Sequence, residues 1–155
     1  MIFKQFFDPI SSTFTYLLAK NKGGEAIIID PVLEKVEIYL QFLGHYGLKL
    51  VKAADTHIHS DHISGLGKLR RITKCMTIMG KESNSDVVSM RVEDGDKIKI
   101  DGLTLEVIYT PGHTEDSYCF YMAGMVFTGD TLLIGGTGRT DFQNGSSEQL
   151  YESLC

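Results

Sequence analysis

Four of the five histidines lie in two short stretches of the sequence. The first stretch, residues 56–62, reads T-H-I-H-S-D-H and holds three of them. Residues two apart in an extended segment point to the same side, so His57 and His59 can face one site. Asp61 and His62 can approach that site from the following turn. Imidazole nitrogens combined with a carboxylate oxygen suit zinc, iron or manganese.

Two further candidate ligands follow later in the chain. His113 comes directly after Pro111-Gly112, a rigid turn that would fix its direction, and Asp130 comes after Gly129 at the end of the apolar stretch Met125–Thr128. Clustered imidazoles repel one another when protonated and gain little from packing. We therefore expect a metal site rather than scattered polar residues. His45 has no partner in sequence and is expected to be structural or exposed.

Hydrophobic periodicity predicts the elements that must position these side chains. Helices are expected over Leu33–Tyr46, from about Asp61 to Ile72, and over Ser147–Leu154 with Ser147 as N-cap. This order predicts a layered α/β protein with two sheets. The expected strands are Ile2–Phe7, Thr13–Ala19, Glu25–Asp30, Leu48–Ala54, Met76–Met79, Lys97–Ile100, Thr104–Tyr109, Tyr118–Met122 and Met125–Thr128.

Composition limits the class of protein. The chain has 155 residues, of which 43% are hydrophobic and 23% charged, which predicts a single folded domain over 1–155. The net charge is −5, and the basic run Lys68–Arg71 is expected to be a solvated helix face, so we expect no nucleic-acid partner. No apolar run approaches the ~20 residues that span a bilayer, which predicts no membrane partner. Three scattered cysteines and no visible targeting segment favour a reducing compartment, with the cytoplasm as the default.

Taken together, the H-x-H-x-D-H motif, Gly112-His113-Thr114 and Phe127–Asp130 resemble the metallo-β-lactamase superfamily. The resemblance implies an αββα sandwich with the metal site at one edge, between the two sheets. A narrower resemblance covers nearly the whole chain and points to the persulfide dioxygenases (sulfur dioxygenases). It rests on Asp8–Leu18, Ile29–Val32, Thr56–Gly65 and, most specifically, Gly138–Gln143 with the sequence G-R-T-D-F-Q.

That family implies one Fe(II) per chain, held by two histidines and one aspartate, which at the matching positions are His57, His113 and Asp130. A 2-His-1-carboxylate site leaves open positions for substrate and O₂. The other residues of the motif have supporting roles in this family, as orienting groups and proton handlers beside the iron. In the hydrolase relatives they help hold metals, Asp61 and His62 supporting a second ion. These residues are His59, Asp61 and His62.

The resemblance further implies a reaction in which glutathione persulfide, O₂ and water give glutathione and sulfite, and it makes a homodimer reasonable. Arg139 is the candidate contact for a substrate carboxylate, because a guanidinium binds carboxylate in a forked geometry. The competing interpretation pairs Arg139 with Asp141 or another acid to stiffen the loop.

Two other functions remain open. One is a zinc-dependent hydroxyacylglutathione hydrolase (glyoxalase II-like), in which zinc lowers the pKa of bound water. The other is a metal-binding fragment without catalysis. No histidine follows His113, which favours one metal over two. The chain also stops within the last predicted helix, so we expect the C-terminal part of the family fold to be missing. In that case the missing histidine carries no information on the metal count.

Overall fold

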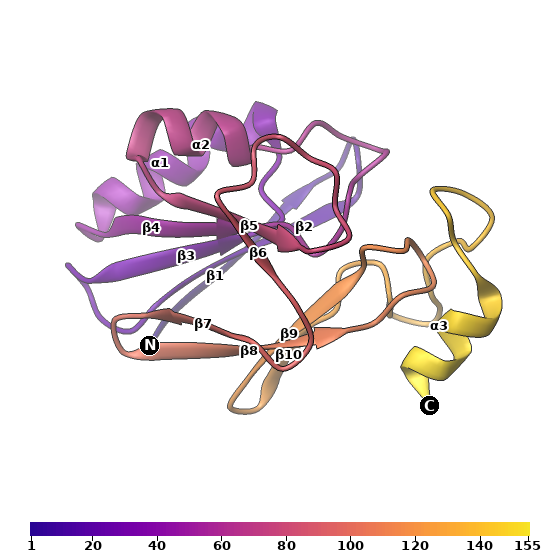
Figure 1. The fold of residues 1–155 in the computed structure, drawn as a ribbon. Helices are drawn as coiled ribbons and strands as arrows, with labels where there is room; N and C mark the ends of the chain where they lie inside the picture. The colour runs from indigo at the N-terminus through magenta and orange to yellow at the C-terminus, as the bar shows by residue number, and fades with distance from the viewer.

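The computed structural model describes residues 1–155 as two β-sheets packed face to face, with helices on one outer side (Figure 1). The first sheet has six strands in the order β1-β2-β3-β4-β5-β6, and the second has four in the order β10-β9-β8-β7. The strands are β1 (Ile2–Asp8), β2 (Thr13–Ala19), β3 (Glu25–Ile29), β4 (Lys49–Ala54), β5 (Met76–Gly80), β6 (Met90–Val92), β7 (Lys97–Ile100), β8 (Leu103–Tyr109), β9 (Tyr118–Met122) and β10 (Met125–Phe127).

The six-stranded sheet is antiparallel on one side and parallel on the other. Strands β1, β2 and β3 pair antiparallel, whereas β3, β4, β5 and β6 pair parallel. Parallel strands need crossover connections, and two helices supply the first two: α1 (Val36–His45), preceded by the 3₁₀ turn Leu33–Lys35, and α2 (Leu66–Thr73). The segments that follow β3 and β4 therefore leave the sheet at the same edge.

Strand periodicity divides the core into two layers. In β2, Leu17 packs with the helix layer and Leu18 packs between the sheets, and both are fully buried. The same alternation in β3 sends Ile28 to the helices and Ile27 to the second sheet. A register slip would move buried side chains to the opposite face of the sheet. The two buried faces therefore fix how the strands pair, and so where their ends lie relative to one another.

The third helix, α3 (Ser147–Leu154), lies beyond the end of the second sheet (Figure 1). Its Leu150 is buried against Gly112, where an added Cβ would come within 2.4 Å of Leu150 backbone atoms. The amide of Ser146 donates to the Gly112 carbonyl, and the Ser153 hydroxyl donates to the Pro111 carbonyl. The helix therefore braces the turn that carries His113.

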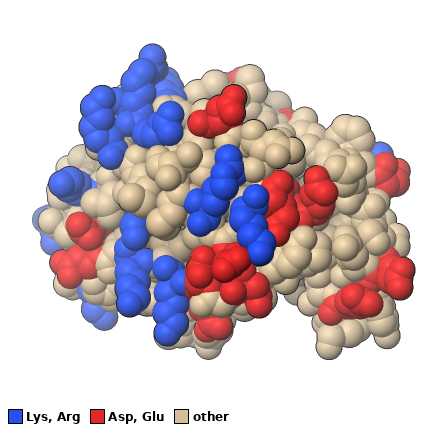
Figure 2. Space-filling model, viewed as in Figure 1, with Lys and Arg blue, Asp and Glu red and all other residues tan.

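Basic side chains lie on several parts of the face shown in Figure 2. One group lies over the helix layer, at the upper left of the view, where α2 contributes Lys68, Arg70 and Arg71. Two of these three basic residues lie in the last turn of α2, where positive charge interacts favourably with the helix dipole. This arrangement agrees with the prediction of a solvated helix face. No helix is long and apolar enough to cross a membrane.

The predicted elements differ from the structure at several boundaries. Helix α2 begins at Leu66 rather than Asp61, because the preceding loop is tied to the segment after β3: the Leu33 amide donates to the Ile63 carbonyl. The N-cap of α3 is Ser146, whose hydroxyl accepts from the Gln149 amide, and not Ser147. Strand β6, which has three residues and pairs only with β5, was not predicted from the sequence.

Candidate metal centre

The H-x-H-x-D-H stretch begins just beyond β4. His57 is buried, and its ring centroid lies 4.2 Å from that of His59. His57 Nδ1 lies 2.9 Å from the Thr56 hydroxyl, which itself donates to Asp30 at 2.9 Å. Since that hydroxyl proton is used on Asp30, its oxygen accepts from His57, and the Nδ1 atom carries the ring proton. The Nε2 lone pair of His57 is left for a ligand.

His113 lies in the turn between β8 and β9. Its Nδ1 atom is 2.7 Å from the backbone carbonyl oxygen of Arg139. A carbonyl can only accept, so Nδ1–H donates and Nε2 is again the free ring nitrogen. The close approach depends on Gly138, because a Cβ there would lie 2.5 Å from both His113 Nδ1 and the Asp130 carbonyl oxygen.

Asp130 completes a convergent set of three donor atoms. Its Oδ2 atom lies 3.6 Å from His57 Nε2 and 3.3 Å from His113 Nε2. All three donor atoms lie within 4.8 Å of one another. Ligand atoms at about 2.1 Å from one ion are roughly 3.0–3.4 Å apart at octahedral or tetrahedral angles, so the set fits a single metal after a small contraction. Asp130 is 40% exposed, which leaves one side of the site open.

The charges of these groups favour a cation. Its contacts with the His113 and His57 rings hold the pKa of Asp130 far below its ordinary value, so this carboxylate stays ionised. Burial lowers the pKa of His57 and favours the neutral ring that a metal needs. Burial acts in the same direction on His113, but the neighbouring Asp130 carboxylate and the bond to the Arg139 carbonyl outweigh it and raise its pKa.

Asp30, which the sequence analysis did not assign to the site, connects several of these residues. Its carboxylate accepts from the Thr56 amide at 2.7 Å, from the Thr56 hydroxyl, and from His59 Nε2 at 3.1 Å. Burial would lower the pKa of His59, but the charge of Asp30 outweighs it and raises that pKa to about 9. Asp30 itself has φ of +55°, a left-handed conformation in which it turns the chain out of β3.

Asp61 and His62 form a second group together with His59. His62 Nδ1 lies 2.9 Å from Asp61 Oδ1 and 3.1 Å from the Thr13 hydroxyl. His62 Nε2 is buried and has no hydrogen-bond partner. The structure therefore brings all six predicted histidine and aspartate residues into two adjacent donor groups: His57, His113 and Asp130 in one, and His59, Asp61 and His62 in the other.

The side chain of Arg139 does not enter the site. Its guanidinium donates to both oxygens of Asp141, at 2.7 and 3.1 Å, and lies 5.6 Å from the ring centre of Phe142. This is the loop-stiffening arrangement that the sequence analysis considered as the alternative. The backbone of Arg139, rather than its side chain, contacts a predicted metal ligand. Substrate binding by this guanidinium stays a prediction.

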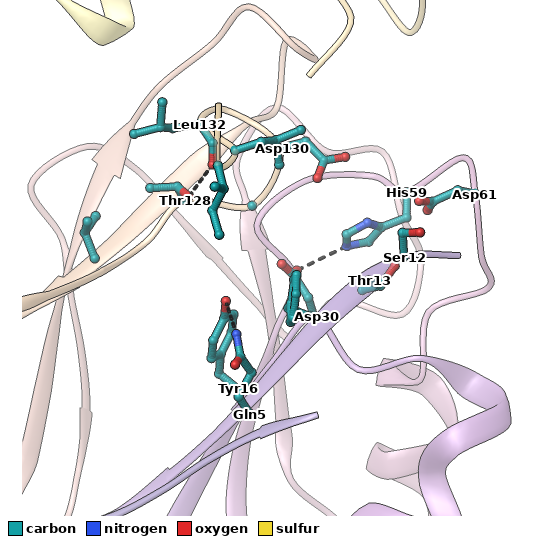
Figure 3. A pocket seen from close by; sticks show the side chains of 15 residues that line it. Gln5, Ser12, Thr13, Tyr16, Asp30, His59, Asp61, Thr128, Asp130 and Leu132 are labelled. Atoms are coloured by element: carbon teal, nitrogen blue, oxygen red, sulfur yellow. Dashed lines mark hydrogen bonds and ion pairs between the residues drawn. The ribbon is translucent and has the colours of Figure 1, made fainter. Parts of the chain in front are cut away.

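A cavity of about 400 Å³ opens beside the metal centre (Figure 3). One end is lined by Asp130, His59 and Asp61. The other end is lined by Gln5 on β1 and Tyr16 on β2, with apolar side chains from β10 and the following loop along the wall. This volume is within the range of small-molecule sites.

The sequence matches the metallo-beta-lactamase superfamily over residues 9–154. This match shows that the chain belongs to the metallo-β-lactamase superfamily, and together with the two facing sheets it confirms the predicted fold. Within that superfamily it is 42% identical to a human (Homo sapiens) protein, persulfide dioxygenase ETHE1, mitochondrial. The match covers 99% of this chain and 61% of the human protein. The predicted resemblance to the persulfide dioxygenases is therefore confirmed.

Two further proteins are similar to this chain, one of them a solved structure. The crystal structure of ETHE1 from Myxococcus xanthus superposes with a TM-score of 0.96 at 45% identity, covering 99% of this chain and 68% of that one. A hydroxyacylglutathione hydrolase from Idiomarina loihiensis is 30% identical over 95% of this chain and 56% of its own length. The chain thus spans about 61% of the length of the persulfide dioxygenases it matches.

Proposed function

We propose that this chain carries the iron centre of a persulfide dioxygenase that oxidises glutathione persulfide with O₂ to sulfite and glutathione. The observation that carries the proposal is the convergence of His57 Nε2, His113 Nε2 and Asp130 Oδ2, with both ring tautomers set by hydrogen bonds on the opposite nitrogen. The 42% identity to a named persulfide dioxygenase supports it independently.

Iron(II), when bound by these three residues, supplies the redox chemistry for O₂ activation, which redox-inert zinc does not. The reaction balances as glutathione persulfide + O₂ + H₂O → glutathione + H₂SO₃. Four electrons pass from the persulfide to O₂. The sulfur–sulfur bond breaks with its electron pair going to the glutathione sulfur, which takes up the persulfide proton. The chain's own residues orient the reactants and exclude water from the buried side of the site.

The surrounding hydrogen bonds fix the orientation of the proposed ligand side chains. Thr56 and the Arg139 carbonyl fix the rings of His57 and His113, while Asp30 holds the Nε2–H of His59. Groups of this kind raise ligand basicity and set ring orientation. Apolar side chains from β10 and the following loop line the cavity beside the open side of Asp130.

The test is anaerobic purification of the chain, elemental analysis, and O₂ uptake after addition of glutathione persulfide. We expect about one iron per chain and O₂ consumption that yields sulfite. His113→Ala should abolish both, whereas His45→Ala should change neither, because His45 is the one histidine outside both donor groups. Two zinc ions per chain and no O₂ uptake would overturn the proposal.

A second candidate is a zinc-dependent hydroxyacylglutathione hydrolase. It is favoured by the unpartnered Nε2 of His62 in the second donor group and by the named hydrolase relatives. Against it, His59 Nε2 and His62 Nδ1 already bind Asp30 and Asp61. Cleavage of a glutathione thioester without O₂ would favour this function, and metal retention without either turnover would identify a non-catalytic fragment.

The proposed partners are a low-molecular-weight thiol persulfide and O₂, in a homodimer, with a place in sulfur metabolism. A cytoplasmic location is also proposed, although the human relative is named as mitochondrial. Light scattering of the purified chain tests the homodimer, and fractionation of expressing cells tests the location.

A further inference from the structure

We propose that Gln5 and Tyr16, at the end of the cavity away from the metal centre, bind an amide group of the thiol substrate. The inference rests on the proposed function for the reaction, and it assigns two residues that contact the peptide part of that substrate. Both residues line the same cavity as Asp130 and His59 (Figure 3), so a ligand in this cavity can contact both ends.

The two side chains are opposite each other across neighbouring strands. Gln5 on β1 is the register partner of Tyr16 on β2, and Gln5 Nε2 donates to the Tyr16 hydroxyl oxygen at 3.2 Å. This bond leaves the hydroxyl proton of Tyr16 and the Oε1 atom of Gln5 free. A free donor beside a free acceptor is complementary to one peptide group, which has one carbonyl and one N–H.

Aromatic packing fixes the direction of the hydroxyl. The ring of Tyr16 lies 5.0 Å from that of Phe127 and 6.0 Å from that of Phe3, centre to centre. These contacts place Tyr16 between the two sheets, on strands rather than on a loop. Figure 3 shows its hydroxyl directed toward the cavity. A donor held this way loses little entropy when a ligand binds.

The charge of the cavity favours a neutral group at this end. Its lining contains no Lys or Arg and includes three carboxylates, Asp30, Asp61 and Asp130. The one histidine of the lining, His59, is paired with Asp30. The nearby guanidinium of Arg139 is paired with Asp141. Carboxylates of a peptide thiol therefore gain nothing inside the cavity, whereas its uncharged amides can pair with Gln5 and Tyr16.

The experiment measures binding of S-methylglutathione to the metal-loaded chain by calorimetry, with Tyr16→Phe as the variant and Tyr151→Phe as the control. Tyr151 is 70% exposed on α3 and does not line the cavity. One lost hydrogen bond corresponds to about 3–10-fold weaker binding. We expect that change for Tyr16→Phe and for Gln5→Met, and none for Tyr151→Phe. S-Methylcysteine, which has no peptide group, should bind Tyr16→Phe and wild type equally.

Equal binding of S-methylglutathione by wild type and Tyr16→Phe, an equal loss for both ligands, or no binding to wild type would each overturn the inference. Circular dichroism and thermal unfolding identify a variant that fails to fold, and Gln5→Met then provides the measurement, because Gln5 is exposed on an edge strand. These measurements do not depend on O₂ uptake. Binding that responds to Tyr16→Phe in a chain that consumes no O₂ would refute the proposed function alone.

Discussion

The Nδ1 atom of His113 donates to the backbone carbonyl of Arg139 at 2.7 Å, so a candidate metal ligand from the β8–β9 turn is oriented by a loop that follows β10. The contact requires Gly138, whose missing side chain leaves room for the imidazole. The G-R-T-D-F-Q stretch thus affects the metal centre through its backbone.

Gly138→Ala should weaken metal binding about 10–100-fold, because the added Cβ would push His113 away from the carbonyl that orients it. Metal affinity is measured by competition with a chelator. Gly136→Ala is the control, since nothing lies within 4 Å of a Cβ at that position. Equal affinities in the two variants would show that the ring does not need this contact.

Arg139→Ala should leave metal content unchanged, because the bond to His113 comes from the backbone. If the guanidinium holds a substrate carboxylate, KM for glutathione persulfide should rise with kcat unchanged. Asp141→Ala should then lower KM, since it releases the guanidinium from its ion pair. A KM unaffected by either substitution would remove Arg139 from substrate binding.

Asp116 joins the two ligand-bearing segments: it accepts from the Ile58 amide at 3.0 Å and from the Thr114 hydroxyl at 2.7 Å, and it is buried. Asp116→Ala should reduce the free energy of unfolding by about 1–3 kcal/mol, because both donors lose their partner. Asp116→Asn should recover part of this loss, and chemical denaturation measures it. The neighbouring Glu115→Ala provides an exposed control, and a similar loss there would argue against the bridging role of Asp116.

Thiol reactivity should separate the three cysteines. Burial raises the pKa of the Cys75 and Cys119 thiols above their ordinary value near 9, so little thiolate forms at pH 8, whereas Cys155 is exposed. A chromogenic disulfide reagent should therefore titrate one thiol rapidly in the native chain and all three in denaturant. Cys155→Ser should remove the rapid phase, and its persistence would place another thiol at the surface.

The clustering of the candidate ligands was predictable because their spacing is unusual: three histidines and an aspartate within six residues have no common packing role. Asp30 was not predictable in the same way, since one acidic residue after an apolar strand looks like many others. The contribution of Arg139 lies in its carbonyl, which every residue type carries, so only the folded backbone reveals it. The start of α2 was misplaced because a hydrogen bond to Leu33, distant in sequence, holds Ile63 in a loop.

The brace that α3 provides at Pro111-Gly112, together with the Arg139 carbonyl, has a consequence for biosynthesis. The imidazole of His113 leaves the ribosome before the partners that set its direction, so the three-ligand pocket is assembled only after most of the chain has emerged. We therefore expect metal binding at this pocket to follow synthesis of the Arg139 loop and α3, because a nascent chain that ends before them lacks the contacts that orient His113.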